Sequence, residues 1–181
     1  MMTNHEARPK VESVDLLLAF SRKKDGETNK KCIRTIVRDF ELDLTILEAK
    51  LKVIGGKWRI HKTVNSRDTE KARKWLLKKL IDNPEFAGCV DSLWRTALLQ
   101  PENIYTNWWL LDIDTQNEDE ISELELRIAH YNGIIKEKIK TPNGWHYIVC
   151  PFDTRQVLEL KNVTLIRDGY SFVKKVGGEN V

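Results

Sequence analysis

Trp108-Trp109-Leu110-Leu111-Asp112-Ile113-Asp114-Thr115 is an apolar run that ends in two carboxylates separated by one residue. A short run of large apolar residues such as this one predicts a buried strand. Because side chains alternate between the two faces of a strand, Asp112 and Asp114 lie on one face and Ile113 on the other. At a rise of ~3.3 Å per residue the two aspartates stand roughly 6–7 Å apart, which suits one or two divalent cations. A solvated turn or a helix cap is the alternative interpretation of this pair.

Length and composition predict one domain spanning residues 1–181, with flexible ends at residues 1–10 and 177–181. No apolar run approaches the ~18–20 residues that cross a membrane, so we expect no membrane partner. The cysteines are widely spaced and form no CxxC motif: Cys32, Cys89 and Cys150. Such cysteines indicate free thiols in a reducing compartment, and we expect a cytoplasmic protein.

Charge is unevenly distributed along the chain, although the net charge is only +3. Basic residues gather between Lys57 and Lys79, and acidic residues dominate between Glu102 and Glu125. A basic surface beside an acidic site suits a polyanion whose phosphates meet a bound metal. An ordinary solvated helix face would explain the same basic run. The candidates for binding nucleic acid are Lys62, Lys71, Lys74 and Lys78.

The hydrophobic pattern predicts helices and strands in a mixed order. We expect helices at residues 14–20, 44–54 (capped by Asp43), from Ser66 or Asp68 to about 81, 91–99, and 117–133. We expect strands at residues 32–40, 58–64, 108–114, 134–139, 145–149, 163–166 and 170–176. This order predicts an α+β fold with a mixed sheet and helices packed on one or both of its faces.

A tight turn that enters a strand is predicted at Thr141-Pro142-Asn143-Gly144-Trp145-His146. Asn-Gly is a strong turn signal, and Gly144 lets a ligand approach the backbone closely. A lone strand histidine such as His146 is often only a packing residue, but its place just after the turn favours a functional role. For His61, on the strand predicted at residues 58–64, packing is favoured over a phosphate contact.

Leu111-Asp112-Ile113-Asp114 and Asn143-Gly144-Trp145-His146 together resemble two motifs of the archaeo-eukaryotic primase superfamily, the primase-polymerases. The first motif of that superfamily is hydrophobic-Asp-hydrophobic-Asp, and the second is a small residue, any residue and His. The resemblance covers roughly residues 32–170, and it is to the short primase-like proteins of phages and plasmids in particular. In those proteins a strand like residues 59–65 precedes the acidic motif, and the histidine strand runs into a stretch like Pro151-Phe152-Asp153. The resemblance implies an RRM-like primase-polymerase core.

The resemblance also implies a role for each matching residue. Asp112 and Asp114 would bind Mg²⁺ or Mn²⁺ and position the phosphates of a nucleoside triphosphate substrate. His146 would contact the triphosphate, and the backbone of Asn143 and Gly144 would assist. Supporting residues near the same sheet edge would be Arg59, Lys62 and Asn65.

A third acidic residue, on a later strand, completes the pattern of the family. Glu159 is our first choice because similar proteins carry an acidic residue and then a basic one here, and Lys161 would be that basic, nucleotide-binding residue. Asp168 is the second choice, although Asp168-Gly169 is also an ordinary hairpin turn signal. The stretch around Lys161 is shorter than the family pattern, which puts two-metal catalysis in doubt.

The sequence therefore predicts a metal-dependent nucleotidyltransferase of primase-polymerase type, acting in the replication or repair of a phage or plasmid in a bacterial cell. We expect nucleic acid as its partner, DNA more than RNA, together with a helicase or other replication proteins. Two alternatives stay open. A catalytically degenerate domain of the same type would bind nucleotide, nucleic acid or a replication partner, and a metal-dependent nuclease would use the same side chains for hydrolysis.

Overall fold

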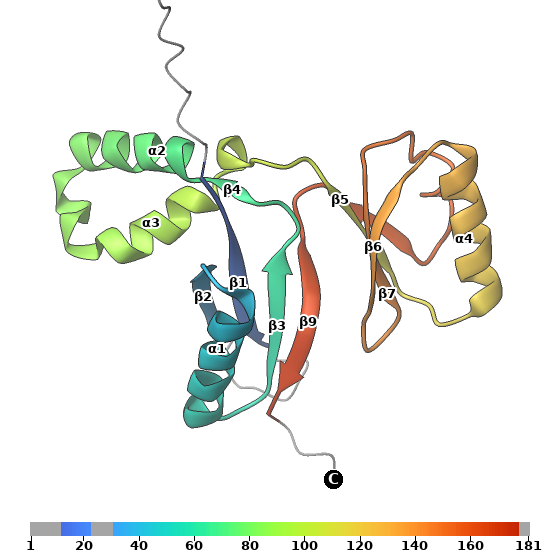
Figure 1. The fold of residues 1–181 in the computed structure, drawn as a ribbon, viewed down its shortest axis with the longest axis horizontal. Coiled ribbons are helices and arrows are strands. Elements are labelled where there is room, and N and C mark those ends of the chain that lie inside the picture. Colours follow the sequence, from blue (N-terminus) through green and yellow to red (C-terminus); the bar gives the residue numbers. More distant parts are fainter. Residues whose placement is uncertain (1–11, 23–30, 178–181) are drawn as a thin grey trace, which may run out of the picture. The chain divides into compact units, whose positions relative to one another are not determined.

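The computed structural model describes residues 12–22 and 31–177, and the chain forms two units. The helical unit comprises Met1–Val14 and Arg67–Tyr105, and the two-sheet unit comprises Asp15–Ser66 and Thr106–Val181. Helices and antiparallel sheets are both present, so the predicted α+β class is confirmed (Figure 1). The flexibility expected of residues 1–10 and 177–181 falls, except for Gly177, on residues that the structure does not describe.

Most of the predicted elements are found close to their expected bounds. In chain order the elements are β1 (Ser13–Ser21), β2 (Lys31–Val37), α1 (Phe40–Ile54), β3 (Trp58–Thr63), β4 (Arg67–Asp68), α2 (Thr69–Asp82), η2 (Pro84–Cys89), α3 (Val90–Leu98), η3 (Pro101–Asn103), β5 (Trp109–Ile113), α4 (Glu118–His130), β6 (Ile135–Lys140), β7 (Trp145–Val149), β8 (Val163–Ile166) and β9 (Tyr170–Val176). Strands β7, β8 and β9 have the predicted bounds. The short elements β4, η2 and η3 were not predicted.

The two-sheet unit is built on two antiparallel sheets instead of the mixed sheet expected from the sequence. Their strand orders are β2-β1-β3-β9 and β6-β7-β5-β8. The short strand β4 also belongs to the first sheet, where it pairs with the start of β1. Every strand pairing in residues 12–22 and 31–177 is antiparallel. A short turn such as residues 141–144, which joins β6 to β7, allows only antiparallel pairing of the strands on either side of it.

The prediction of a helix at residues 14–20 is wrong, because this segment is strand β1. Strand β1 pairs with β2 on one side and β3 on the other. Leu16, Leu17, Leu18 and Ala19 are each at most 1% exposed. A strand covered on both faces carries a continuous apolar run instead of an alternating one, and such a run cannot be distinguished from a buried helix by its periodicity.

Helix α1 begins earlier than predicted because a different residue caps it. Asp39 is the N-cap, and its side chain accepts the N–H of Leu42 at 3.1 Å. Asp43, the predicted cap, lies inside the helix and accepts the backbone N–H groups of Arg38 and Asp39. These two hydrogen bonds lower the pKa of Asp43. Because the prediction has Asp43 as the cap in place of Asp39, the predicted start of the helix is about one turn too late.

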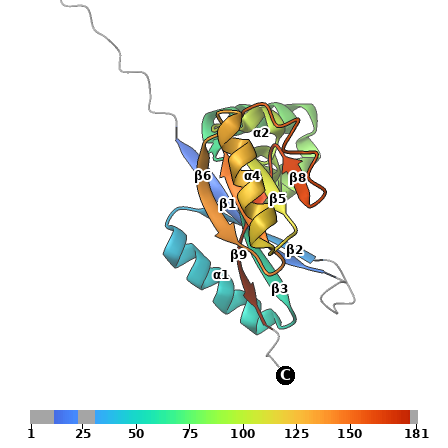
Figure 2. The same cartoon turned by 90° about the vertical axis from the view of Figure 1, so that its right-hand side faces the viewer.

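Each sheet of the two-sheet unit has its own helix and its own core. The buried face of α1 packs Leu44, Leu47 and Leu51 against β1 and β3. Leu124 and Ile128 of α4 pack against the second sheet, and Figure 2 shows α4 lying across the face of that sheet. Helix α4 therefore covers only one face of β5 and β7, and their opposite face does not contact this helix.

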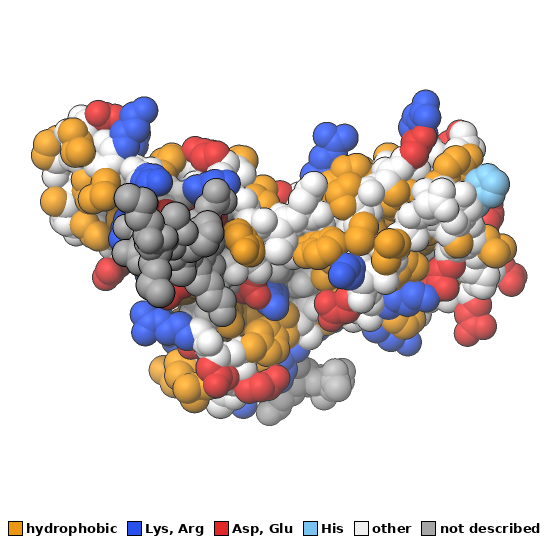
Figure 3. Space-filling model, turned by 45° about the horizontal axis from the view of Figure 1, so that its top comes forward, with side chains coloured by type: hydrophobic (Ala, Val, Ile, Leu, Met, Phe, Trp, Pro, Cys, Tyr) orange, Lys and Arg blue, Asp and Glu red, His pale blue; other side chains and the backbone are white. Residues whose placement is uncertain are grey.

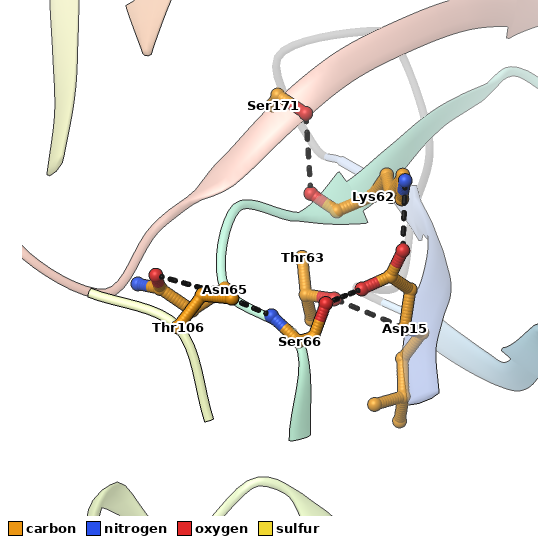
Figure 4. A network of polar contacts seen from close by, with 8 residues as sticks. Asp15, Lys62, Thr63, Asn65, Ser66, Thr106 and Ser171 are labelled. Atoms are coloured by element: carbon orange, nitrogen blue, oxygen red, sulfur yellow. Dashed lines mark hydrogen bonds and ion pairs between the residues drawn. The ribbon is translucent and has the colours of Figure 1, made fainter. Parts of the chain in front are cut away.

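A polar network ties the loop after β3 to the segment that leads into β5 (Figure 4). Asn65 is 1% exposed. Its Oδ1 accepts the Trp108 N–H at 2.6 Å and its Nδ2 donates to the Trp108 carbonyl at 2.9 Å. Thr106 donates its hydroxyl to the same Oδ1 at 3.2 Å. The Asn65 amide thus satisfies both backbone groups of Trp108, as a neighbouring strand would, just before β5 begins.

We expect Asn65→Ala to lower the free energy of unfolding by roughly 2–3 kcal/mol, because both backbone groups of Trp108 lose their partner. Thr106→Ser keeps the hydroxyl that accepts the Ser66 N–H and donates to Asn65 Oδ1, so it is expected to cost roughly 1 kcal/mol at most, for the lost methyl group. Urea unfolding followed by tryptophan fluorescence measures both variants. Equal stabilities of the two variants would contradict the role given to Asn65.

Candidate functional site

Asp112 and His146 lie opposite each other on neighbouring strands. The antiparallel register of β5 and β7 pairs them directly, and directly opposed residues project from the same face. His146 Nε2 lies 3.3 Å from Asp112 Oδ1. The same register pairs Leu111 with Tyr147, which both belong to the core beneath α4. The alternation predicted for both strands is therefore confirmed: their polar face is turned away from α4.

The imidazole of His146 is held by a backbone group of the other sheet. Phe172, on the edge strand β9, donates its N–H to His146 Nδ1 at 3.0 Å. A ring nitrogen that accepts a hydrogen bond carries no proton, so the neutral ring has its proton on Nε2, the atom beside Asp112. His146 is only 8% exposed. It therefore joins the two sheets and presents one N–H donor next to a carboxylate.

A polar cavity of about 100 Å³ lies around this pair. Its lining combines acidic, basic and amide side chains with the turn between β6 and β7: Arg22, Arg59, His61, Asp112, Asp114, Thr141, Pro142, Asn143, His146 and Phe172. The structure thus brings five of the predicted site residues to one cavity: Asp112, Asp114, His146, Asn143 and Arg59. Arg22 and His61 were not selected from the sequence as site residues.

A second, larger cavity of about 430 Å³ shares part of this lining. Both cavities are lined by Asp112, His146, His61 and Arg22. The larger one adds Asp168, from the turn between β8 and β9, and the mostly apolar residues Phe20, Leu110, Ile166, Gly169 and Tyr170. One end of the site is therefore charged, and the other has apolar walls.

Glu159 and Lys161 lie at a different cavity. They line a space of about 270 Å³ together with Ile113 and Thr115. Because Ile113 projects from the face of β5 opposite to Asp112, this space is on the core side of the strand. Glu159 is exposed and lies 3.7 Å from the Arg127 guanidinium. Of the two candidates for a third acidic residue, Asp168 is the one that shares a cavity with Asp112.

The predicted lysines do not line either of the cavities at Asp112. Lys62 pairs with Asp15 at 2.8 Å and lies over the ring of Phe40, at the start of α1. Alternation along β3 gives Lys62 the face opposite to Arg59 and His61, so Lys62 lies away from the two cavities at Asp112. The α2 lysines belong to the helical unit, where Lys71 and Lys74 lie near Asp68 and Glu70: the distances are 4.0 and 3.6 Å.

Gly144 makes a close contact that is different from the predicted one. A Cβ atom at this position would lie 1.9 Å from the Ile113 carbonyl oxygen and 2.9 Å from the Thr115 backbone nitrogen. The backbone that approaches Gly144 is therefore the end of β5, whereas the sequence suggested a ligand. This contact holds the turn that carries Asn143 against the segment that carries Asp114.

His61 lines both cavities at Asp112, although the sequence favoured only a packing role for it. Both of its ring nitrogens are buried, and neither makes a hydrogen bond of good geometry in the described part of the chain. Its ring lies edge-on to Phe20 and Phe172. Burial lowers its pKa to about 4, the backbone of Tyr170 opposes this shift, and the nearby Arg22 adds to it. The signal in the sequence was its position two residues after Arg59 on the same strand, which puts both on one face.

A metal at this site would have few protein ligands. In residues 12–22 and 31–177, no three His, Cys, Asp or Glu side chains gather closely enough to hold a metal ion by themselves. Mg²⁺ is commonly held by one or two carboxylates, with substrate phosphates and water as its other ligands. Asp112 and Asp114 supply such a pair at one cavity, so the donor set fits a metal that binds together with a polyphosphate.

We expect Gly144→Ala to lower the free energy of unfolding by roughly 1–3 kcal/mol, because the new methyl group overlaps the Ile113 carbonyl. Gly88→Ala is the matched control, since a Cβ there meets nothing within 4 Å. Thermal unfolding monitored by circular dichroism compares the two variants. A Gly144→Ala variant as stable as the control would show that the turn is not held by this contact.

The lowered pKa of His61 predicts a loss of stability in acid. The unfolded chain takes up a proton near pH 6.5, whereas the folded chain does so only near pH 4. The contribution of His61 is therefore fully present above pH 6.5, and roughly 3 kcal/mol of it is lost as the pH falls to about 4. We expect His61→Phe to flatten this part of the stability profile, measured by urea unfolding at several pH values. His130→Phe, at an exposed position, should leave the profile unchanged, and an unchanged profile for His61→Phe would contradict the burial argument.

Comparisons with protein-family models, with curated proteins and with solved structures find no match to this chain. The helices of the described residues are each too short or too polar to cross a lipid bilayer. Functional assignment therefore rests on the chemistry of the site.

Proposed function

We propose that this protein is a metal-dependent nucleotidyltransferase of primase-polymerase type, which binds a nucleoside triphosphate at the polar cavity around Asp112. The primase-polymerase core of the fold is part of the same proposal. One observation carries it: the strand register pairs Asp112 with His146, and Asp114, Asn143 and Arg59 line the same cavity. Asp112, Asp114, Asn143 and His146 belong to the two motifs, and Arg59 adds a positively charged side chain.

The two aspartates would hold Mg²⁺ or Mn²⁺, with phosphate oxygens and water as the remaining ligands. A bound metal of this kind neutralises phosphate charge and orients the hydroxyl and leaving groups in phosphoryl transfer. Asp112 is partly buried between β7 and β8, where its position is fixed. Asp114 lies just after β5, and its backbone N–H donates to the Asn162 carbonyl at 2.9 Å. Both carboxylates therefore belong to a segment with little freedom to move.

His146 and the two arginines would bind the phosphates. The Nε2–H of His146 is a fixed donor beside the carboxylates, which suits a phosphate oxygen that arrives with its metal. Arg22 and Arg59 line the same cavity and supply positive charge. Positioning and charge neutralisation are the main demands of phosphoryl transfer, so this set of side chains meets them without a covalent nucleophile.

Asp168, and not Glu159, is our choice for a third acidic residue. Asp168 shares the larger cavity with Asp112, whereas Glu159 lies with the core-side residues of β5. Asp168 also lies near Asn65, whose Nδ2 is 3.5 Å from its Oδ1. Asp168 would contribute its carboxylate from the end of the site that has mostly apolar walls.

Nucleic acid would bind through basic surface, DNA more than RNA, with a helicase or other replication proteins as further partners. The basic residues of α2 (Lys71, Lys74 and Lys78 among them) lie in the helical unit, and Figure 3 shows Lys and Arg side chains at the surface of this part of the molecule, interspersed with hydrophobic ones. Lysine charge at a surface attracts phosphates and makes binding sensitive to salt.

A nucleoside triphosphate with Mn²⁺ should raise the melting temperature by roughly 5 °C at saturating concentration, because it binds only the folded chain. We expect Asp112→Asn combined with Asp114→Asn to abolish this rise and Asp168→Asn to reduce it. Glu159→Gln is the matched control and should keep the full rise. Differential scanning fluorimetry measures all four proteins; a rise that survives in the double variant would exclude the aspartates as the metal site.

Incubation with a labelled primer on a template separates the three functions considered from the sequence. Lengthening of the primer with triphosphate and Mn²⁺ supports the nucleotidyltransferase. A nucleotide-dependent thermal shift without lengthening favours the catalytically degenerate binding domain, and shortening favours the nuclease. The Asp112→Asn variant should lose whichever activity is seen, which excludes a contaminating enzyme.

A further inference from the structure

Helix α1 carries a second apolar face that no part of its own sheet covers. Leu42, Ile46 and Val53 are 58%, 55% and 88% exposed, and Ala49 between them is also exposed. Their spacings of four, three and four residues place all four side chains on one stripe, because the helix has about 3.6 residues per turn. The buried face of the same helix, with Leu44, Leu47 and Leu51, already packs on β1 and β3.

Charged residues flank this stripe in an ordered way. At the same helical spacing, Glu41 and Lys52 lie along one side of the stripe, and Asp43 and Lys50 lie along the other. On both sides the acidic residue is near the start of the helix and the basic residue is near its end. A helix with this arrangement is complementary to itself when it is turned end to end.

We propose that the outer stripe of α1 binds the same stripe of a second copy of this chain, with the two helices antiparallel around a twofold axis. In this pairing Leu42 faces Val53 of the other copy, and Ile46 faces Ala49. The alternating large and small side chains then interlock, as in other apolar helix pairs. A twofold axis repeats each contact, so one surface is sufficient for both copies.

The same antiparallel register also brings opposite charges together on both sides of the stripe. Glu41 meets Lys52 of the second copy, and Asp43 meets Lys50. A parallel arrangement would instead bring Glu41 beside Asp43 of the second copy and Lys52 beside its Lys50, which is repulsive. The charges therefore select the antiparallel pair.

The contact is small for a protein interface, because one helix from each copy supplies most of it. Interfaces below the standard size are usually transient. We expect a dissociation constant on the order of 10–100 µM, at which monomer and dimer exchange.

Sedimentation equilibrium of the full chain at increasing concentration tests the dimer. The average mass should rise from 21.1 kDa towards twice that value. Ile46→Glu places a charge in the centre of the stripe and should keep the protein monomeric at every concentration. Leu126→Glu is the matched control, since Leu126 is 72% exposed on α4, away from the stripe, and it should associate like the unchanged protein. A constant monomer mass, or a dimer that persists in Ile46→Glu, would overturn the proposal.

Mixing two charge-reversed chains tests the antiparallel register. Lys52→Glu and Glu41→Lys should each weaken self-association by roughly tenfold, because each brings like charges together. The two variants mixed in equal amounts should recover association. In the mixed dimer, Glu41 of the Lys52→Glu chain meets Lys52 of the Glu41→Lys chain, and the two substituted residues also meet as a Glu–Lys pair. Circular dichroism confirms that each variant is folded. Failure of the mixture to recover, with both variants folded, would exclude this register.

Discussion

The hydrogen bond from the Phe172 N–H to His146 Nδ1 is the contact on which the arrangement of the site depends. An edge strand presents backbone groups that need partners, and here one of them is satisfied by a side chain of the other sheet. That bond fixes the imidazole, leaves its Nε2 as a donor, and brings β9 to the polar face of β7. The cavities at Asp112 are lined from both sheets because of this junction.

Electrostatics and burial give the site two different ends. Near Asp114 the lining is charged, with Arg22 and Arg59 close to the carboxylates. Near Phe20 the walls are mostly apolar, and His61 stays neutral because burial disfavours its charged form. A ligand with a charged, metal-binding part and a less polar part would match this division, as a nucleotide does.

Local rules predicted much of the site. The alternation of side chains placed Asp112 and Ile113 on opposite faces, and Asn143-Gly144 marked the turn correctly, because both effects depend only on neighbouring residues. Glu159 could not be told from Asp168 in the same way. The choice between them depends on which face of β5 each loop reaches, and residues far apart in the sequence determine that. The leucines of β1 were misread for a related reason, since only the strands on either side explain why all of them are buried.

The sequence by itself determined the α+β class, the bounds of the strands that carry the motifs, and the face from which each motif residue projects. These features follow from hydrophobic period and turn chemistry, which act within a few residues. Only the tertiary structure decided that β5 pairs with β7 in the register that sets Asp112 opposite His146, and that the edge of β9 reaches His146. Strand register and sheet packing are set by the burial of whole faces, so no single segment of the chain contains them.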